Sequence, residues 1–386
     1  MTATASEACA RYLSKRGSVR RIAQAPFGLH RGLGESLSAF RDGAASFLDS
    51  MERQLQAIGL PRPLHFDIIE SAFDDDSSGN AGQDAYAVAD PYAEESETPA
   101  SFVLFTAAFA RDIFLAWDAL LTRTELFRDV GNPDMEQPAA VLVAPGPADP
   151  IRAAYARDQA LLTLEFALYH EFYHVASGHL EAIKQAGLEA RLHAVTRSPE
   201  QVNLDARRYK VLELDADMMA LRHLTTDVLA GRQLVSHGAL ETSSEGERFR
   251  HLGRSVTLLF RLIELWRRNE HIQYTAADFH PHPDVRDATL HAYLQLNADT
   301  DEARSLELAQ AYARGQEDII EALEAMNTLA PNFGIVEGLG QDLAARETEW
   351  LIPELNRIRK EGVCAQDFRR VAARRRQPQA DEQAGS

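Results

Sequence analysis

Residues 169 to 179 read YHEFYHVASGH and contain two histidines with the spacing of a metal site. His170 and His174 are four positions apart. On a helix, which turns about once every 3.6 residues, both imidazoles then lie on one face and can reach the same ion. Glu171 lies beside them, where a carboxylate can take a proton from a water molecule at the metal. The pattern predicts a catalytic zinc site on a helix.

The alternative is an amphipathic helix that carries two surface histidines. The residues before the motif, ALLTLEFALY over 160–169, are apolar nearly all round. Phe172, Tyr173 and Val175 leave no clearly solvated face within the motif itself. Titratable groups at the end of a buried helix are costly unless they are paired or bound to a metal. These surroundings favour the metal site over the surface helix.

A catalytic zinc site needs a third protein ligand and an open fourth position. A third histidine ten positions after the first, as in the metzincins, is excluded because that position is Leu180. The ligating cysteine that peptide deformylases carry shortly before the motif is also missing. A glutamate from a later helix remains, and Glu213 in the segment VLELDADMMAL fits this role.

The segment ELDAD contains three carboxylates with different expected roles. Glu213 and Asp217 share a helix face, so Glu213 can ligate zinc while Asp217 accepts a hydrogen bond from a ligating histidine and fixes its tautomer. Asp215 is about 200° round from Glu213 and is expected to point away. The same residues could instead form an acidic stripe on a surface helix. His179 is expected to be a polar residue at the helix end rather than a group in the cleft.

The order HExxH followed by ExxxD resembles the gluzincin family that contains the CAAX prenyl endopeptidases and the HtpX-like heat-shock proteases. Before the motif, DAYAV at 84–88 is similar to a family strand reading approximately NAFA, and FVLFTAAF at 102–109 to one of the type IVVTxGLL. After the third ligand, HPHPDVR at 280–286 keeps the family's HPxxxxR spacing. The elements agree in order from residue 64 to residue 290.

The chain departs from this family at three points. The strand asparagine is Asp84, the glycine of GLL is absent, and the membrane helices of the best-known members are missing. These departures point to a soluble offshoot, for which the Lit-like phage-exclusion peptidases and other bacterial cytosolic zincins are the nearer comparison. The resemblance implies a minimal gluzincin fold, in which a small sheet packs on the motif helix and its edge strand binds an extended peptide.

The resemblance also implies a donor for the oxyanion of the reaction. It nominates His280, with His282 as the fallback, although each could be an ordinary loop histidine. Arg286 is expected to anchor this loop onto the helix pair. The resemblance does not imply a particular substrate.

The expected activity is zinc-dependent hydrolysis of peptide bonds by a metalloendopeptidase with one Zn²⁺ per chain and Glu171 as the general base. One rival is a catalytically silent zincin-like protein with a regulatory or binding role, against which the intact Glu171 argues. Another is a zinc hydrolase that acts on a small amide. Ten acidic residues and no Lys or Arg lie between Arg62 and Arg111. They form either a solvated loop or a negative rim that steers a basic peptide.

The elements that must position these residues form a strand-rich first part and a helical remainder. Apolar periodicity predicts a helix over 39–58, strands over 64–70, 85–89, 101–109 and 139–144, and a helix from the third strand to about residue 127. The motif helix is expected to begin at Pro150, capped by Asp149, and to run through Ala176 to a stop near Gly178. Further helices are predicted over 205–229, 246–269, 284–297, 302–328 and 341–360.

This layout is α+β, with a small mixed sheet packed on the HExxH helix and a mostly helical remainder. The chain divides into a basic arm and helix over 1–60, a zincin domain over 61–290, a helical region over 291–362, and a disordered tail over 363–386. A net charge of −18 argues against nucleic acid as a partner. Cys9 and Cys364 are too few for a disulfide framework, and no stretch reads as a membrane span. We therefore expect a cytoplasmic protein that acts on a protein or peptide.

Overall fold

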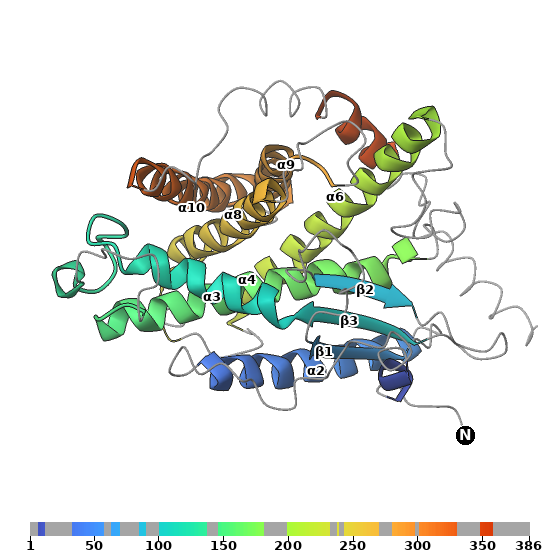
Figure 1. The fold of residues 1–386 in the computed structure, drawn as a ribbon. Coiled ribbons are helices and arrows are strands. Elements are labelled where there is room, and N and C mark those ends of the chain that lie inside the picture. The colour runs from blue at the N-terminus through green and yellow to red at the C-terminus, as the bar shows by residue number, and fades with distance from the viewer. Residues whose placement is uncertain are drawn as a thin grey trace, which may run out of the picture.

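The computed structural model shows a mostly helical molecule, with one small sheet among the described residues (Figure 1). The described residues are 7–11, 33–57, 63–69, 85–89, 100–136, 146–180, 199–231, 238, 243–269, 280–297, 301–329 and 348–357. The strand predicted over 139–144, the loop expected after the first strand and the tail predicted over 363–386 all lie outside these residues.

The sheet has the strand order β1-β3-β2 and is mixed. β1 (Leu64–Ile69) runs parallel to β3 (Ser101–Thr106), and β2 (Ala85–Ala89) runs antiparallel to β3. The α+β class predicted from the sequence is therefore confirmed. Among the described strands β2 pairs with β3 alone, so it lies at an edge of this sheet.

β3 is shorter than predicted because its last residue also starts a helix. The hydroxyl of Thr106 accepts a hydrogen bond from the backbone N–H of Phe109 at 3.1 Å and so caps α3 (Ala107–Leu121). The prediction that the strand continues to Phe109 was therefore wrong, because residues 107–109 form the start of α3. α3 in turn ends at Leu121, before the predicted end near Phe127, with Thr122 as its C-cap.

β3 is buried on both faces of the sheet. Val103 and Phe105 belong to the main hydrophobic core, which α2 (Leu33–Ala57) also enters through Phe40. Phe102 and Leu104 face the other way and pack with Cys9 in a smaller cluster. Side chains alternate between the two faces of a strand, so the central strand joins both clusters.

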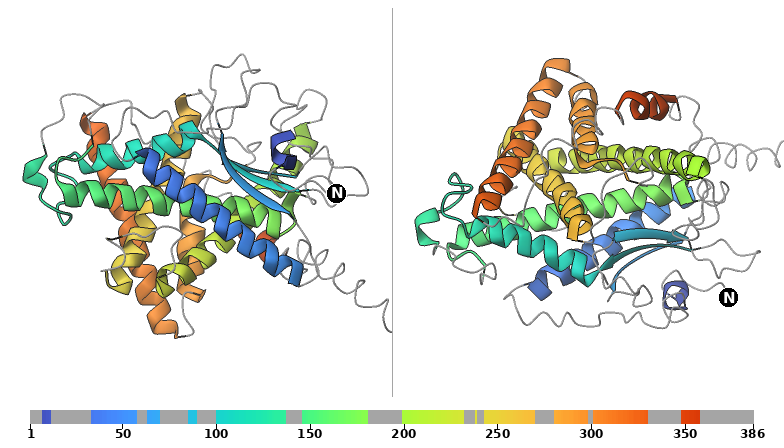
Figure 2. Two further views of the ribbon diagram at one scale, coloured as in Figure 1. Left: turned by 90° about the horizontal axis from the view of Figure 1, so that it is seen from below. Right: turned by 45° about the horizontal axis from the view of Figure 1, so that its top comes forward.

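α4 (Pro150–Ala176) lies in the middle of the molecule, with the sheet and α2 on one side and the later helices on the other (Figures 1 and 2). The carboxylate of Asp149 accepts hydrogen bonds from the N–H groups of Ile151 and Arg152 at 2.8 and 2.9 Å. The helix ends at Ala176, and the chain turns at Gly178 with φ +76°, a conformation that glycine adopts without strain. The predicted bounds of this helix are confirmed.

The remaining helices follow the predicted order. They are α6 (Pro199–Ala230), α8 (Glu245–Asn269), α9 (Pro283–Asn297) and α10 (Glu302–Leu329), with a 3₁₀ turn η1 (Pro133–Met135) and a helical segment over 348–357. α6 begins before the predicted residue 205, and the described helical residues 348–357 lie within the predicted 341–360.

α10 shares the core of the motif helix. Tyr312 belongs to the same hydrophobic cluster as Phe166 of α4. α10 and α8 approach closely, since a Cβ atom on Gly253 would lie 2.1 Å from the carbonyl oxygen of Tyr312, and one on Gly315 2.1 Å from that of Arg250. Within the described residues no helix has both the length and the apolar character needed to cross a bilayer.

Candidate metal centre

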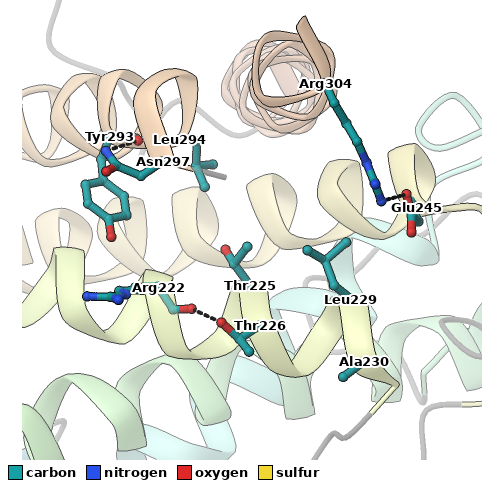
Figure 3. Close-up of a pocket in the computed structure, with 10 residues that line it drawn as sticks. All are labelled: Arg222, Thr225, Thr226, Leu229, Ala230, Glu245, Tyr293, Leu294, Asn297 and Arg304. Carbon is teal, nitrogen blue, oxygen red and sulfur yellow. Dashed lines mark hydrogen bonds and ion pairs between the residues drawn. The ribbon is translucent and has the colours of Figure 1, made fainter. Parts of the chain in front are cut away.

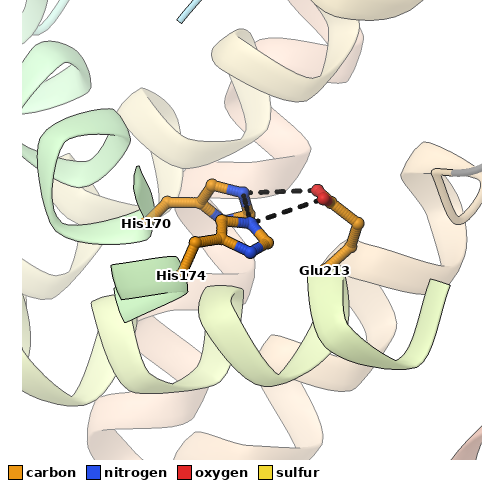
Figure 4. Close-up of side chains that lie close together, drawn as sticks. All are labelled: His170, His174 and Glu213. Carbon is orange, nitrogen blue, oxygen red and sulfur yellow. Dashed lines mark hydrogen bonds and ion pairs between the residues drawn. The ribbon is translucent and has the colours of Figure 1, made fainter. Parts of the chain in front are cut away.

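Two helices bring the predicted metal ligands together (Figure 4). α4 supplies His170 and His174, one turn apart, and α6 supplies Glu213. Nε2 of His170 lies 3.1 Å from Nε2 of His174. Oε2 of Glu213 lies 3.3 Å from the first of these nitrogens, and Oε1 lies 3.3 Å from the second. All three side chains are buried. The sequence-predicted ligand set is therefore one cluster in space.

The spacing of these atoms suits a single ion. Zinc bonds of about 2.0 to 2.1 Å in a tetrahedral arrangement place neighbouring ligand atoms about 3.3 to 3.4 Å apart. The nitrogen–nitrogen distance of 3.1 Å and the two nitrogen–oxygen distances of 3.3 Å, each to a different Glu213 oxygen, are close to this value. Two imidazole nitrogens and a carboxylate oxygen, buried together, could hold a metal ion.

Glu171 lies beside this cluster without joining it. Its Oε1 atom is 4.0 Å from Nε2 of His170, and its side chain is 13% exposed. The Glu171 carboxylate is thus near His170 but is not part of the group of His170, His174 and Glu213 that could hold a metal ion. This is the position expected of a proton-transfer group rather than of a ligand.

Asp217 contacts the outer nitrogen of His170, as the helix periodicity predicted. Oδ1 of Asp217 lies 2.8 Å from Nδ1 of His170, although the ring is turned off the line of an ideal hydrogen bond. Arg286 of α9 donates two hydrogen bonds to the same carboxylate. Its guanidinium carbon also lies 4.1 Å from the centroid of the Phe260 ring on α8. Arg286 therefore anchors α9 to α6, as expected. It does so through the carboxylate of Asp217, which also contacts the candidate ligand His170.

Charge and burial act differently on the two histidines. Burial lowers the pKa of His170, but the carboxylates of Asp217 and Glu213 outweigh it and raise the pKa to about 10. Burial lowers the pKa of His174 to about 3, opposed only in part by Glu213. His174 is thus a neutral imidazole over the physiological range, which is the form that binds metals.

The two carboxylates of the site are held ionised. Burial raises the pKa of Glu213, but the charge of His280, together with the hydrogen bond and charge of His170, holds it well below its ordinary value. Burial likewise raises the pKa of Asp217, and the guanidinium of Arg286 lowers it below the ordinary value. Ionised carboxylates are the form that ligates a cation and accepts hydrogen bonds.

The two candidate oxyanion donors have different surroundings. His280 is partly exposed and lies close enough to the third ligand for its charge to lower the pKa of Glu213. His282 is buried at the start of α9, where its Nδ1 accepts a hydrogen bond from the N–H of Asp284 at 3.3 Å. Its carbonyl oxygen accepts from the N–H groups of Val285 and Arg286. His282 therefore caps α9.

Sequence reasoning missed the place of His179. This residue is fully buried, with Nδ1 3.1 Å from Nδ1 of His174 and Nε2 3.3 Å from Oδ2 of Asp215. A polar residue at the helix end was expected here, but its burial and its contacts with His174 and with Asp215 of α6 were not. Asp215 does point away from the ligand atoms, yet it is buried and contacts His179. The apolar character of the motif helix was the signal that its end would be covered.

Two hollows described on the surface lie away from the ligands. One, of about 420 Å³, lies between α6 and α9 and is closed at one end by an ion pair of 2.7 Å between Arg304 and Glu245 (Figure 3). The other, of about 680 Å³, lies between α2 and α6 and includes Tyr173, the neighbour of His174. Neither is lined by a metal ligand or by Glu171.

No protein-family model, no curated protein and no solved structure matches this chain.

Proposed function

We propose that the protein is a zinc-dependent metalloendopeptidase of the gluzincin type that acts in the cytoplasm. The observation that carries the proposal is the buried group of His170, His174 and Glu213, in which each imidazole Nε2 lies 3.3 Å from one oxygen of the Glu213 carboxylate and 3.1 Å from the other Nε2. Two histidines and one glutamate are the ligands of several catalytic zinc sites. Iron(II) also accepts two histidines and a carboxylate. The position of Glu171 beside the ligands favours hydrolysis, and with it zinc.

A zinc ion bound by these residues would lower the pKa of water toward about 7 and polarise the scissile carbonyl group. Glu171 takes a proton from the attacking water and passes it to the leaving nitrogen. The partial exposure of its side chain supports this role, because the carboxylate must meet both solvent and substrate.

His280 is the proposed donor to the oxyanion of the tetrahedral intermediate. Its electrostatic influence on Glu213 supports a place beside the third ligand. His282 is the fallback donor, because its Nδ1 accepts a hydrogen bond at the start of α9 and its ring proton is then on Nε2. The contacts that Arg286 makes with Asp217 and Phe260 hold α9, and with it the end of the loop that carries His280.

The proposed substrate is an extended segment of a protein or peptide. β2 is the described edge of the sheet next to α4, and an edge strand presents unpaired backbone groups to which a peptide can add as a further strand. A peptide bound in this way would run along the motif helix.

The test uses the untagged full-length chain supplied with zinc. A peptide library is incubated with the wild type and with Glu171→Gln, and the products are identified by mass spectrometry. We expect cleavage by the wild type that 1,10-phenanthroline abolishes and that its weakly chelating isomer 1,7-phenanthroline leaves intact. Cleavage that survives both Glu171→Gln and chelation would refute the proposal. Stoichiometric zinc without any cleavage would favour the alternative of a silent zincin-like binding protein.

A further inference from the structure

The outer nitrogen of His174 does not face a carboxylate directly, as that of His170 does. It faces His179, whose other nitrogen lies 3.3 Å from Asp215. His179 is fully buried, and the Asp215 side chain is 12% exposed. A neutral imidazole has one donor nitrogen and one acceptor nitrogen, so the contact on one side of His179 determines the contact on its other side.

The donors in the His174–His179 and His179–Asp215 contacts follow from what the proposed metal and Asp215 each require. Nε2 of His174 can offer a lone pair to a metal only if the ring proton is on Nδ1. That proton is then donated to Nδ1 of His179, whose own proton must be on Nε2. Nε2–H of His179 faces Oδ2 of Asp215, which accepts it. The opposite proton placement would leave His179 and Asp215 as two acceptors facing each other.

We infer that His179 and Asp215 are positioning residues that hold His174 in the tautomer and orientation that ligate the metal. The inference rests on the proposed metal site. It gives each carboxylate of the ELDAD segment a separate task. Glu213 ligates, Asp217 contacts the first histidine directly, and Asp215 acts on the second histidine through His179. Such outer contacts fix the ligand geometry of metal sites.

The same helix offers a matched control. On α6, Asp227 contacts His223 at 3.4 Å between Oδ2 and Nε2, and the Asp227 side chain is 13% exposed. The far nitrogen of His223 contacts the hydroxyl of Tyr173 at 2.9 Å rather than a metal ligand. Asp227→Asn therefore changes an aspartate of similar exposure, in an aspartate–histidine contact of similar length that does not reach a proposed ligand. It also changes the acceptor of the Tyr169 hydroxyl.

The experiment measures zinc affinity of the full-length protein by competition with a chromophoric chelator. We expect Asp215→Asn and His179→Gln each to weaken zinc binding by about 10- to 100-fold, the usual range for such outer contacts. The double variant should be no weaker than His179→Gln alone, because both changes break one chain of contacts. Asp227→Asn should bind zinc as the wild type does.

A second measurement needs no variant. Long-range ¹H–¹⁵N correlation of histidine-labelled, zinc-loaded wild type should show His174 protonated on Nδ1 and His179 on Nε2. Protonation of His179 on Nδ1 overturns the inference, and so does a zinc affinity of Asp215→Asn equal to that of Asp227→Asn. These results leave the proposed metal site standing if the wild type binds zinc. A wild type that binds no zinc removes the metal site and the inference together.

Discussion

The guanidinium of Arg286 donates two hydrogen bonds, of 2.7 and 2.6 Å, to the carboxylate of Asp217 in the interior of the protein. The same carboxylate lies 2.8 Å from Nδ1 of His170. Three helices thus meet at one carboxylate, since Arg286 belongs to α9, Asp217 to α6 and His170 to α4. The orientation of the first candidate ligand therefore depends on the docking of α9.

We predict that Asp217→Asn weakens zinc binding by about 10- to 100-fold, because the amide is a poorer acceptor for the ligating histidine. The change also leaves the buried guanidinium of Arg286 without its anion, and breaking a buried pair typically costs about 3 to 5 kcal/mol. Chelator competition and denaturant unfolding of the metal-free protein measure the two effects. Unchanged affinity in a folded variant would contradict the role given to Asp217.

We predict that the untagged wild type binds one zinc ion per chain, because His170, His174 and Glu213 form the described cluster of metal-ligating groups. His174→Ala should abolish stoichiometric binding in elemental analysis. His291→Ala is the control, since this residue on α9 contacts Gln295 rather than the site. Equal metal content in the two variants would show that the zinc is bound elsewhere.

Glu171→Gln should retain zinc and lose activity. The glutamine keeps the size of the side chain but cannot accept the proton of water, and a general base contributes about 10² to 10⁴ in rate. Metal content and the rate of peptide cleavage are measured on the same preparation. If Glu171→Gln loses zinc as readily as His174→Ala does, Glu171 is a ligand and its assignment is wrong.

His280→Ala should lower kcat by about 10² to 10³ and leave KM and zinc content nearly unchanged, because an oxyanion donor acts in the transition state. His282→Ala is the contrasting variant. Loss of its contact with the N–H of Asp284 should cost about 1 kcal/mol of stability, as for other helix caps, with a smaller effect on kcat. A normal kcat for His280→Ala would require another donor.

The last prediction concerns Asp287, which accepts hydrogen bonds from Thr257 and Arg261 of α8 at 3.1 and 3.2 Å. Burial raises its pKa from 3.8 to about 6, against the opposing charge of Arg261. The folded protein therefore binds this proton more tightly than the unfolded chain does. Its contribution to the free energy of unfolding is favourable at low pH and is lost as the pH rises through about 6.

Asp287→Asn removes this titration. The stability of the wild type relative to the variant should fall by about 1 to 3 kcal/mol between pH 4 and pH 7, at about 1.4 kcal/mol per unit of pKa shift. Denaturant unfolding of both proteins in the presence of a chelator, at steps across this range, measures the difference. Parallel stability curves for the two proteins would show that Asp287 keeps an ordinary pKa in the folded state.

Local signals in the sequence determined the motif helix and the faces of its ligands. Asp149, Pro150 and Gly178 act within one turn of the helix ends, so the bounds of α4 could be predicted from them. Helical periodicity alone placed His170 beside His174 and Glu213 on the face of Asp217. The gluzincin resemblance added the loop of His280 and remains a proposal.

Only the tertiary structure decided which groups contact Asp215 and Asp217 on α6. Periodicity showed that Asp215 points away from Glu213, but whether that side of α6 meets water or protein depends on the packing of α4. His179 comes from another part of the chain and fills that place. Arg286 reaches Asp217 in the same way, from a helix much later in the sequence. Contacts between distant segments depend on how helices dock, and a single sequence records only the periodicity within each helix.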